Sequence, residues 1–259
     1  LKTFHEIVET WNQAHPEYIV KTKEYTVFHK PAEDALAASD LEQPSIVLAP
    51  EYMTGKMMSA MGEKKVVSIG TLLPPERLVK IAEIVKRTFG DTNGNLACLP
   101  FNPSCGVLYA NGNLVKKMPE TFEELEAICK KLVQEGSVKN GYTCAWPAAY
   151  LVEMPAAQQD FPLALPENGK LGFGQYVLSS EWLCKHLIDL RKMQQEGTFV
   201  YAGKTNDAKK PFINKEVAFF MQGAVHSATL EKEAEFPILA GALPTLSRGQ
   251  QTKLALPLG

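Results

Sequence analysis

GVLYANGNLVKKMPETFEELEAICKKLVQEGSVKNGYTCA, residues 106–145, contains the strand–helix–strand pattern that decides the fold class. Thr121 and Glu124 have the spacing of a capping box, in which two side chains satisfy amide groups at the start of a helix. Residues 106–109 and 142–145 are short apolar runs of strand length on either side of that helix. Four apolar residues share one face of the helix: Phe122, Leu125, Ile128 and Leu132.

The same alternation of strands and helices continues on both sides of this stretch. Further strands are predicted for residues 18–22, 45–50, 98–101, 217–221 and 236–240. Further helices are predicted for residues 4–15, 31–39, 74–89 and 181–195. Repeated strand–helix–strand units imply mainly parallel sheets covered by helices, which is the α/β class.

The composition supports a folded chain of up to two modest domains and gives no sign of a polyanionic partner. The chain has 259 residues, of which 45% are hydrophobic, and this is enough to bury a proper core. Its formal net charge is -2, so we expect no binding to nucleic acid or to an anionic membrane surface. No apolar run approaches the roughly 18 residues that a membrane-spanning helix needs.

The five cysteines and five histidines show no spacing typical of metal ligands. We therefore expect no metal, and no motif suggests another cofactor. A disulfide scaffold is not expected in a chain of this length with so few cysteines. Cys129 and Cys184 fall on apolar faces of predicted helices, where we expect buried thiols.

The sequence contains none of the common catalytic motifs, such as a GxSxG elbow, a Walker loop, HExxH or a GxGxxG after a strand. The three glycines of residues 169–174 lack the preceding strand that a phosphate-binding loop needs, so we interpret this segment as a turn. We therefore name no catalytic residue and expect a protein that is not an enzyme. An α/β hydrolytic enzyme with scattered catalytic groups remains the alternative from another class.

Six segments spread over the whole chain carry a resemblance to a known family. They are WNQAHPEY (11–18), the second predicted strand with its following residues (44–58), LPFNPSCGVLY (99–109), TFEEL (121–125), GYTCAW (141–146) and FVYAG (199–203). In their order and spacing they resemble the extracellular solute-binding proteins of carbohydrate-type ABC importers. Within that family the chain is most similar to the members that bind glycerol-3-phosphate.

The resemblance implies a two-lobed, periplasmic-binding-protein-like fold in which crossing strands join two α/β lobes. It implies lobe one at residues 1–103, lobe two at 104–252 and a crossover back to lobe one at 253–259. The solute lies between the lobes of such proteins, and the lobes close by hinge motion. Compared with the family, we expect the chain to be truncated at both ends.

The resemblance also implies the function. A protein of this kind captures a polyol-type small molecule, such as glycerol-3-phosphate or a glycerophosphodiester, for import. A sugar is the alternative solute within the same family. The implied partners are the solute and the membrane permease of an ABC importer, and we expect a monomer. The implied location is the periplasm or, with a lipid anchor, the outer side of the cytoplasmic membrane.

Three residues are candidate solute contacts because they match family positions. Glu51 follows a predicted buried strand, and its carboxylate can accept two hydrogen bonds from hydroxyls; the alternative is a water-facing residue at a helix start. Ser104 lies in the crossover turn, where the family places a hydroxyl on phosphate, although serines are common in turns. Trp146 matches a stacking tryptophan of the family, and the alternative is an ordinary core tryptophan.

Three further positions depart from the family pattern. Tyr150 lies beside the position of a second family tryptophan and is a candidate substitute for its stacking face. Gly223 stands where the family has a phosphate-binding serine, so it can offer only its backbone amide. Phe28 lies near the position of a family tyrosine in lobe one. Because of these departures, we expect a solute that can lack the phosphate group.

Overall fold

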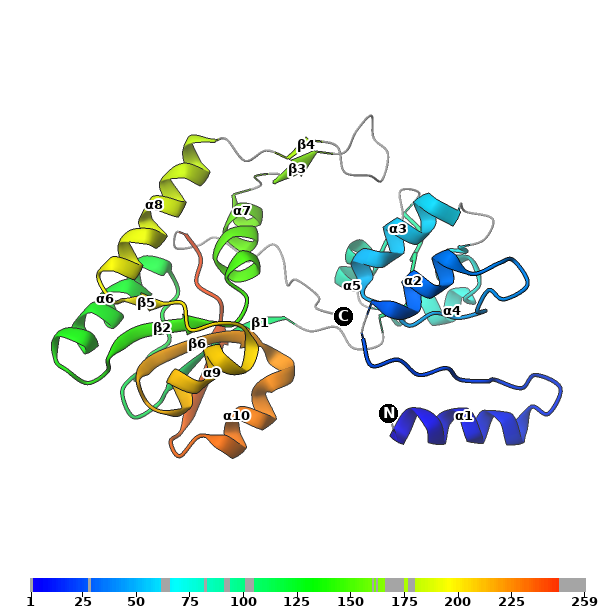
Figure 1. Cartoon of the computed structure of the whole chain (residues 1–259), viewed down its shortest axis with the longest axis horizontal. Coiled ribbons are helices and arrows are strands. Elements are labelled where there is room, and N and C mark those ends of the chain that lie inside the picture. Colours follow the sequence, from blue (N-terminus) through cyan, green and yellow to red (C-terminus); the bar gives the residue numbers. More distant parts are fainter. Residues whose placement is uncertain are drawn as a thin grey trace.

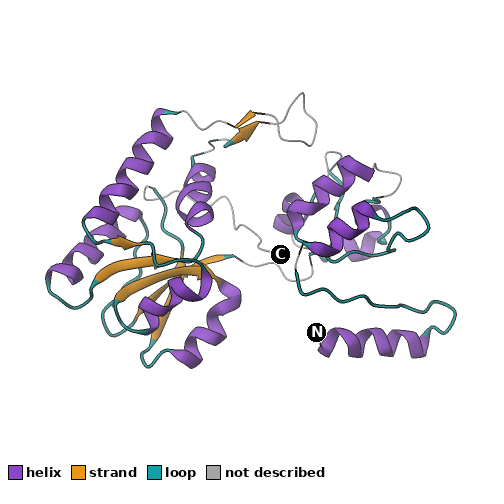
Figure 2. Cartoon of the chain, viewed as in Figure 1, coloured by secondary structure: helices purple, strands orange, loops and turns teal. Residues whose placement is uncertain are grey.

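The structure is a computed structural model that describes residues 2–27, 29–61, 66–81, 83–90, 94–100, 105–159, 161, 163–165, 175–176 and 180–246. Its α-helices are α1 (Lys2–Ala14), α2 (Lys30–Ala37), α3 (Glu51–Met61), α4 (Pro75–Leu78), α5 (Glu83–Thr88), α6 (Phe122–Gln134), α7 (Met154–Gln158), α8 (Glu181–Gln195), α9 (Thr205–Ile213) and α10 (Ser227–Glu233). Its strands are β1 (Gly106–Asn111), β2 (Asn140–Cys144), β3 (Ala164–Leu165), β4 (Gln175–Tyr176), β5 (Phe199–Val200), β6 (Val217–Gly223) and β7 (Ile238–Ala242). Figures 1 and 2 show α1 to α5 gathered apart from the main sheet.

Five strands form one mixed sheet in the order β5–β2–β6–β1–β7, and β3 and β4 form a separate antiparallel pair. β2 pairs in parallel with β5 and β6, whereas β1 pairs antiparallel with β6 and β7. Four strands therefore point in one direction and β1 in the other, which fits the mainly parallel sheet predicted from the sequence. Because Cys144 is in register with Met221, the carboxyl ends of β2 and β6 lie together.

Helices cover both faces of this sheet, as Figure 1 shows. α6, α7 and α8 cover one face, where Leu125 and Met193 belong to the same buried cluster as Tyr142. α9 and α10 cover the other face, where Phe212 and Leu230 belong to a second buried cluster. Burial of apolar area on two faces of one sheet is the dominant stabilising contribution in this part of the chain.

α6 begins and ends where its local sequence predicts. The amide of Glu124 donates to Thr121 Oγ1 at 3.2 Å, and the amide of Glu120 donates to Glu124 Oε2 at 2.8 Å. At the other end Gly136 adopts φ +69°, and the amide of Ser137 donates to the carbonyl of Leu132 at 2.9 Å. The left-handed conformation is typical of a glycine that terminates a helix.

Thr121→Ala should lower the free energy of unfolding by about 1 kcal/mol, because the amide of Glu124 loses its hydrogen-bond partner at the helix start. Urea denaturation followed by circular dichroism measures this change. Thr10→Ala is the control, since Thr10 lies inside the exposed helix α1 and its hydroxyl bonds only to the carbonyl of Glu6. A loss at Thr121 no larger than the loss at Thr10 would contradict the capping role.

Three predicted strands of the first hundred residues are wrong where the structure describes them. Residues 18–22, 45–50 and 98–100 are not in strands. Ile46 and Leu48 are 86% and 56% exposed, although we predicted a buried strand there. A strand needs a neighbouring strand to pair its backbone groups, and no described strand lies before β1.

The helices of this region also differ from the prediction. α1 has its apolar residues on one face as expected, but no residue of the helix is buried. The single helix predicted for residues 74–89 is interrupted and forms α4 and α5. Only the apolar pattern of the sequence predicted α1 and a continuous helix at residues 74–89. Helices this short depend on packing for their stability. Within the described residues, no helix combines the length and the apolar character required to cross a membrane.

Candidate functional site

Trp146 lies directly beyond the carboxyl end of β2. The amide of Ala145 donates to the carbonyl of Met221 at 3.0 Å, so the sheet still holds the chain one residue before the tryptophan. The side chain of Trp146 is 42% exposed, and Trp146 is therefore not the core residue that we weighed as the alternative. Carboxyl ends of parallel strands are common places for ligands in α/β proteins.

A π-helical turn, η2 (Ala148–Glu153), follows Trp146 and is continuous with α7. The amide of Tyr150 donates to the carbonyl of Trp146 at 2.9 Å, so both residues belong to the same turn. In a regular helix the carbonyl of Leu151 would accept a hydrogen bond from the amide four residues later, but Pro155 has no amide hydrogen. The carbonyl of Leu151 instead accepts a hydrogen bond of 2.6 Å from His186 Nε2 on α8.

Tyr150 points into the protein, unlike Trp146. Its side chain is 1% exposed. The ring lies so close to Gly106 that a Cβ atom there would meet Tyr150 Cε1 at 2.8 Å and a methyl group of Leu243 at 2.5 Å. Burial raises the pKa of the phenol, which therefore stays neutral. Within the described part of the chain its hydroxyl has no hydrogen-bond partner.

The groups around Gly223, at the end of β6, are paired inside the protein. The amide of Gly223 donates to Gln222 Oε1 at 2.8 Å, and its carbonyl accepts from the Tyr109 hydroxyl at 3.3 Å. Tyr109 also hydrogen-bonds to Ser227 Oγ at 2.9 Å. The amide of Ala224 donates to the carbonyl of Cys105 at 2.8 Å. The backbone amide that we proposed as the contribution of Gly223 is therefore occupied.

Three of the six predicted site residues, Trp146, Tyr150 and Gly223, come together at the carboxyl ends of β2 and β6. Gly106 connects two of them, because it is in register with Gly223 and packs against Tyr150. We call this region the β2–β6 edge, made of Cys105, Trp146, Tyr150, Gly223 and residues 224–227. Glu51 is the first residue of α3, and its side chain lies outside the described part of the structure. Ser104 and Phe28 also lie outside the described residues.

Sequence reasoning missed the hydrogen-bonded pair of Tyr109 and Ser227. Tyr109 belongs to the segment that resembles the family crossover, but nothing in the sequence links it with a serine 118 residues away. Tyr109 packs against Phe220 and belongs to the buried cluster under α9 and α10. The pair ties the start of α10 to the sheet and so holds the β2–β6 edge in place.

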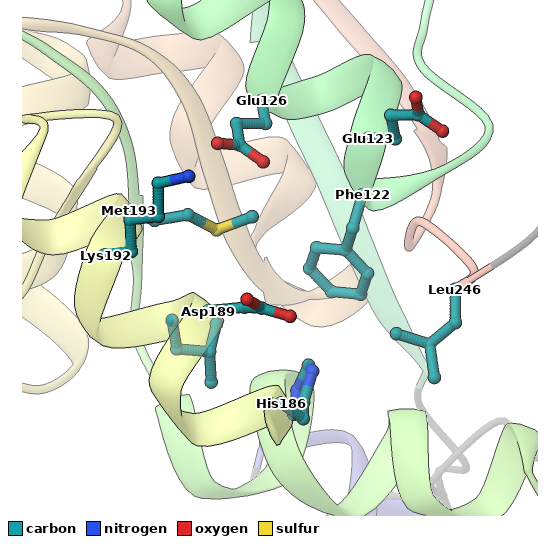
Figure 3. Close-up of a pocket in the computed structure, with 9 residues that line it drawn as sticks. Phe122, Glu123, Glu126, His186, Asp189, Lys192, Met193 and Leu246 are labelled. Carbon is teal, nitrogen blue, oxygen red and sulfur yellow. The ribbon is translucent and has the colours of Figure 1, made fainter. Parts of the chain in front are cut away.

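A separate groove of about 280 Å³ lies between α6 and α8, and Figure 3 shows His186 and Asp189 of α8 facing Phe122 of α6 across it. Its lining combines apolar side chains, such as Phe122 and Leu190, with the carboxylates of Glu123, Glu126 and Asp189. None of the predicted site residues lines this groove. Nowhere in the described ranges do three or more His, Cys, Asp or Glu side chains gather as a metal site would require.

Comparison with known proteins gives a consistent family assignment. Residues 6–256 match the model of the family described as bacterial extracellular solute-binding protein. The sn-glycerol-3-phosphate-binding periplasmic protein UgpB of Yersinia pestis is 27% identical over 258 residues, which is 94% of this chain and 58% of that protein. UgpB of Salmonella typhimurium is 26% identical over 257 residues with the same coverage. The chain thus spans less than three fifths of the length of these relatives.

The fold agrees with this assignment. A maltotriose binding protein of Thermus thermophilus, solved with maltotriose, superimposes with a TM-score of 0.65 at 15% sequence identity. The match covers 99% of this chain and 65% of the other, and it confirms the predicted two-lobed α/β fold class. The family description and the periplasmic relatives indicate a location outside the cytoplasm, in the periplasm or on the outer side of the membrane. The chain belongs to the family of bacterial extracellular solute-binding proteins.

Proposed function

We propose that the protein captures a polyol-type small molecule, such as glycerol-3-phosphate or a glycerophosphodiester, and delivers it to the membrane permease of an ABC importer. The observation that carries this proposal is the family match over residues 6–256. The relatives that bind glycerol-3-phosphate support the choice of solute, although they are only 26% to 27% identical to this chain over the aligned residues. The protein acts as a monomer in this proposal.

The geometry of the β2–β6 edge supports a binding role. A half-exposed indole at the end of a parallel strand offers a flat apolar face to the C–H groups of a polyol. Lobe one at residues 1–103, lobe two at 104–252 and a returning crossover at 253–259 remain our proposed division. Closure of two such lobes would bury a small solute and create the surface that a permease recognises.

A neutral sugar is the second candidate solute. Phosphate in a closed site requires cationic or multiple hydrogen-bonding partners, because an unpaired charge is costly to bury. The described residues of the β2–β6 edge include no lysine or arginine. Proteins of this family bind solutes, so a hydrolytic enzyme, the alternative from another class, has no support at the family level.

Isothermal titration calorimetry with glycerol-3-phosphate, glycerophosphocholine and maltotriose tests the proposal on the full chain. We expect saturable binding of at least one glycerol compound at a 1:1 ratio. Binding of maltotriose alone would transfer the proposal to the sugar. If all three probes produce no saturable heat while the protein remains folded by circular dichroism, the proposed function is wrong.

Trp146→Ala should weaken binding of the best probe about 5- to 30-fold, because stacking on an indole contributes about 1 to 2 kcal/mol. The melting temperature should change little, since the side chain is half-exposed. A buried core tryptophan would behave differently, because its truncation costs about 3 to 5 kcal/mol of stability. Calorimetric titration and thermal melts on the same samples separate the two effects.

Trp11→Ala is the matched control. Trp11 is 45% exposed, similar to Trp146, and it lies on α1, where its indole N–H donates to the carbonyl of Tyr18 at 3.1 Å. The affinity of this variant should equal that of wild type. Equal affinity of wild type and Trp146→Ala for every probe that binds would remove Trp146 from the site.

A further inference from the structure

Among the buried side-chain oxygen and nitrogen atoms of the β2–β6 edge, one has no hydrogen-bond partner in the described structure. The amide and carbonyl of Gly223, the amide of Ala224 and the hydroxyls of Tyr109 and Ser227 all have partners inside the protein. The Tyr150 hydroxyl has none. The other unpartnered buried group of the described residues is the Thr143 hydroxyl. It lies on the opposite face of the sheet, because Thr143 alternates with Tyr142 along β2.

Packing determines what Tyr150 can contribute. The ring is buried against Gly106 and Leu243, so it cannot present its face to a solute as a stacking residue would. The stacking role that the family resemblance implied for Tyr150 is therefore not possible in this arrangement. The hydroxyl is therefore the part of the side chain that can bind a partner, as a hydrogen-bond donor.

The hydroxyl makes no favourable contribution in this structure. A phenylalanine would fill the same apolar space without leaving a polar atom unsatisfied, and an unsatisfied buried donor destabilises the protein. The raised pKa keeps the phenol protonated, so it offers one O–H to an acceptor. A partner that is present only in another state of the protein would account for a tyrosine at this position.

We propose that Tyr150 is a specificity-determining residue whose hydroxyl donates a hydrogen bond to an uncharged hydroxyl oxygen of the bound solute. This inference rests on the proposed function and names the solute chemistry at this end of the site. The exposed indole of Trp146 and the phenol of Tyr150 belong to one turn, joined by the 2.9 Å hydrogen bond between the Tyr150 amide and the Trp146 carbonyl. The two residues therefore share one turn, from which the indole faces outward and the phenol inward.

The turn itself can adjust when a solute binds. η2 has the wide π-helical geometry, which is rare and occurs frequently at functional sites. Pro155 removes a backbone hydrogen bond at its end, and His186 replaces it from another helix. The anchored Leu151 carbonyl holds one end of the turn, and stacking on Trp146 acts on the other. The proposal therefore requires this turn to shift on solute binding, so that the hydroxyl reaches the solute.

The test compares wild type and Tyr150→Phe by calorimetric titration with glycerol-3-phosphate and its two deoxy analogues, 3-hydroxypropyl phosphate and 2-hydroxypropyl phosphate. If maltotriose is the probe that wild type binds, maltotriose and its monodeoxy derivatives replace this series. The substitution should weaken binding of the parent probe about 5- to 10-fold, as expected for one hydrogen bond. For the analogue that lacks the contacted hydroxyl, the two proteins should differ by less than twofold.

Stability measurements and a second variant exclude a merely structural effect. Tyr150→Phe should keep or raise the melting temperature, because it removes an unsatisfied group. Tyr142→Phe is the control, since the hydroxyl of Tyr142 is also buried but bonds to Met193 Sδ at 3.6 Å, and its affinity should equal that of wild type.

Three outcomes overturn the inference. Unchanged affinity of Tyr150→Phe for every probe that wild type binds would show that the hydroxyl does not contact the solute. An equal loss for the parent probe and all its deoxy analogues would show that the partner of the hydroxyl belongs to the protein. If wild type itself binds no probe, the proposed function fails first, and this inference falls with it.

Discussion

Iodoacetamide should modify Cys184 of the native protein at least about 1000 times faster than Cys144. Cys184 is exposed, whereas Cys144 and Cys129 are fully buried in the cluster under α6 and α8. Burial raises the pKa of Cys144 from 9.0 to about 12, and burial likewise raises the pKa of Cys129. The thiolate is the reactive form of a cysteine. The rise in the pKa of Cys144 from 9.0 to about 12 lowers its thiolate fraction about 1000-fold at pH 8.

Timed alkylation at pH 8, followed by peptide mass spectrometry, measures the rate at each cysteine. The same reaction in urea is the control, because all five thiols should then react at similar rates. Rapid labelling of Cys144 or Cys129 in the native protein would contradict the packing of α6 on β2. The exposure of Cys184 is a correction to the sequence analysis, which placed it on a buried helix face. That face of α8 turns toward solvent because Leu183, His186 and Met193 are the buried residues of the helix.

This result bears on the proposed location. None of the five cysteines, all of which lie in the described residues, forms a disulfide, and burial shelters Cys129 and Cys144 from oxidants. Proteins outside the cytoplasm meet an oxidising environment, where exposed thiols are open to reaction. If Cys184 is the only cysteine that reacts rapidly, the thiol chemistry is compatible with export. If several cysteines react rapidly, the thiol chemistry counts against export.

Gly141→Ala should lower the free energy of unfolding by about 3 kcal/mol or more. A Cβ atom at this position would lie within 2.7 Å of the carbonyl oxygen of Thr198 and of both the Cβ and Sγ atoms of Cys129. Gly141 thus permits a close approach of α6 to β2 at the point where β2 also bonds to the segment before β5. Backbone atoms cannot move aside as a flexible side chain can, so overpacking here exceeds its usual cost of about 1–3 kcal/mol.

Gly241→Ala is the matched control for this prediction. Gly241 lies in β7 of the same sheet, and the nearest atoms to its added Cβ belong to the flexible side chain of Met118 at 3.3 Å. This substitution should change stability by less than about 1 kcal/mol. Urea denaturation at equilibrium measures both variants. Equal stabilities of the two variants would show that α6 can move away from β2 without loss.

Sequence alone determined β1, α6, β2, α8, β6 and β7 because their signals are local, whereas α7, α9 and β5 were not predicted. The predicted bounds of α8 agree with the observed Glu181–Gln195, and Ser180 accepts a hydrogen bond from the amide of Leu183 at its start. The predicted strands at 217–221 and 236–240 correspond to β6 and β7 within two residues. Caps and apolar periodicity act within a few residues, so they can be read from the chain without knowledge of its neighbours.

The first hundred residues illustrate the opposite case. Residues 45–50 have the composition of a buried strand, but burial and pairing depend on a partner, and the sequence of the segment does not contain that information. The direction of β1 is a similar case. Nothing in residues 106–111 indicates that this strand runs opposite to β6 and β7 on both sides of it.

The same distinction between local sequence and tertiary structure holds for the candidate site. From the sequence, Trp146 could be placed after a strand, and the family resemblance marked it as a stacking residue. Only the tertiary structure decided that its indole is half-exposed, that the amide of Gly223 is occupied and that Tyr150 is buried with a free hydroxyl. These properties arise from contacts such as Gly106 with Gly223 and Tyr150, between residues far apart in the chain. A local pattern determines the type of an element, whereas exposure and hydrogen-bond satisfaction depend on which other elements pack beside it.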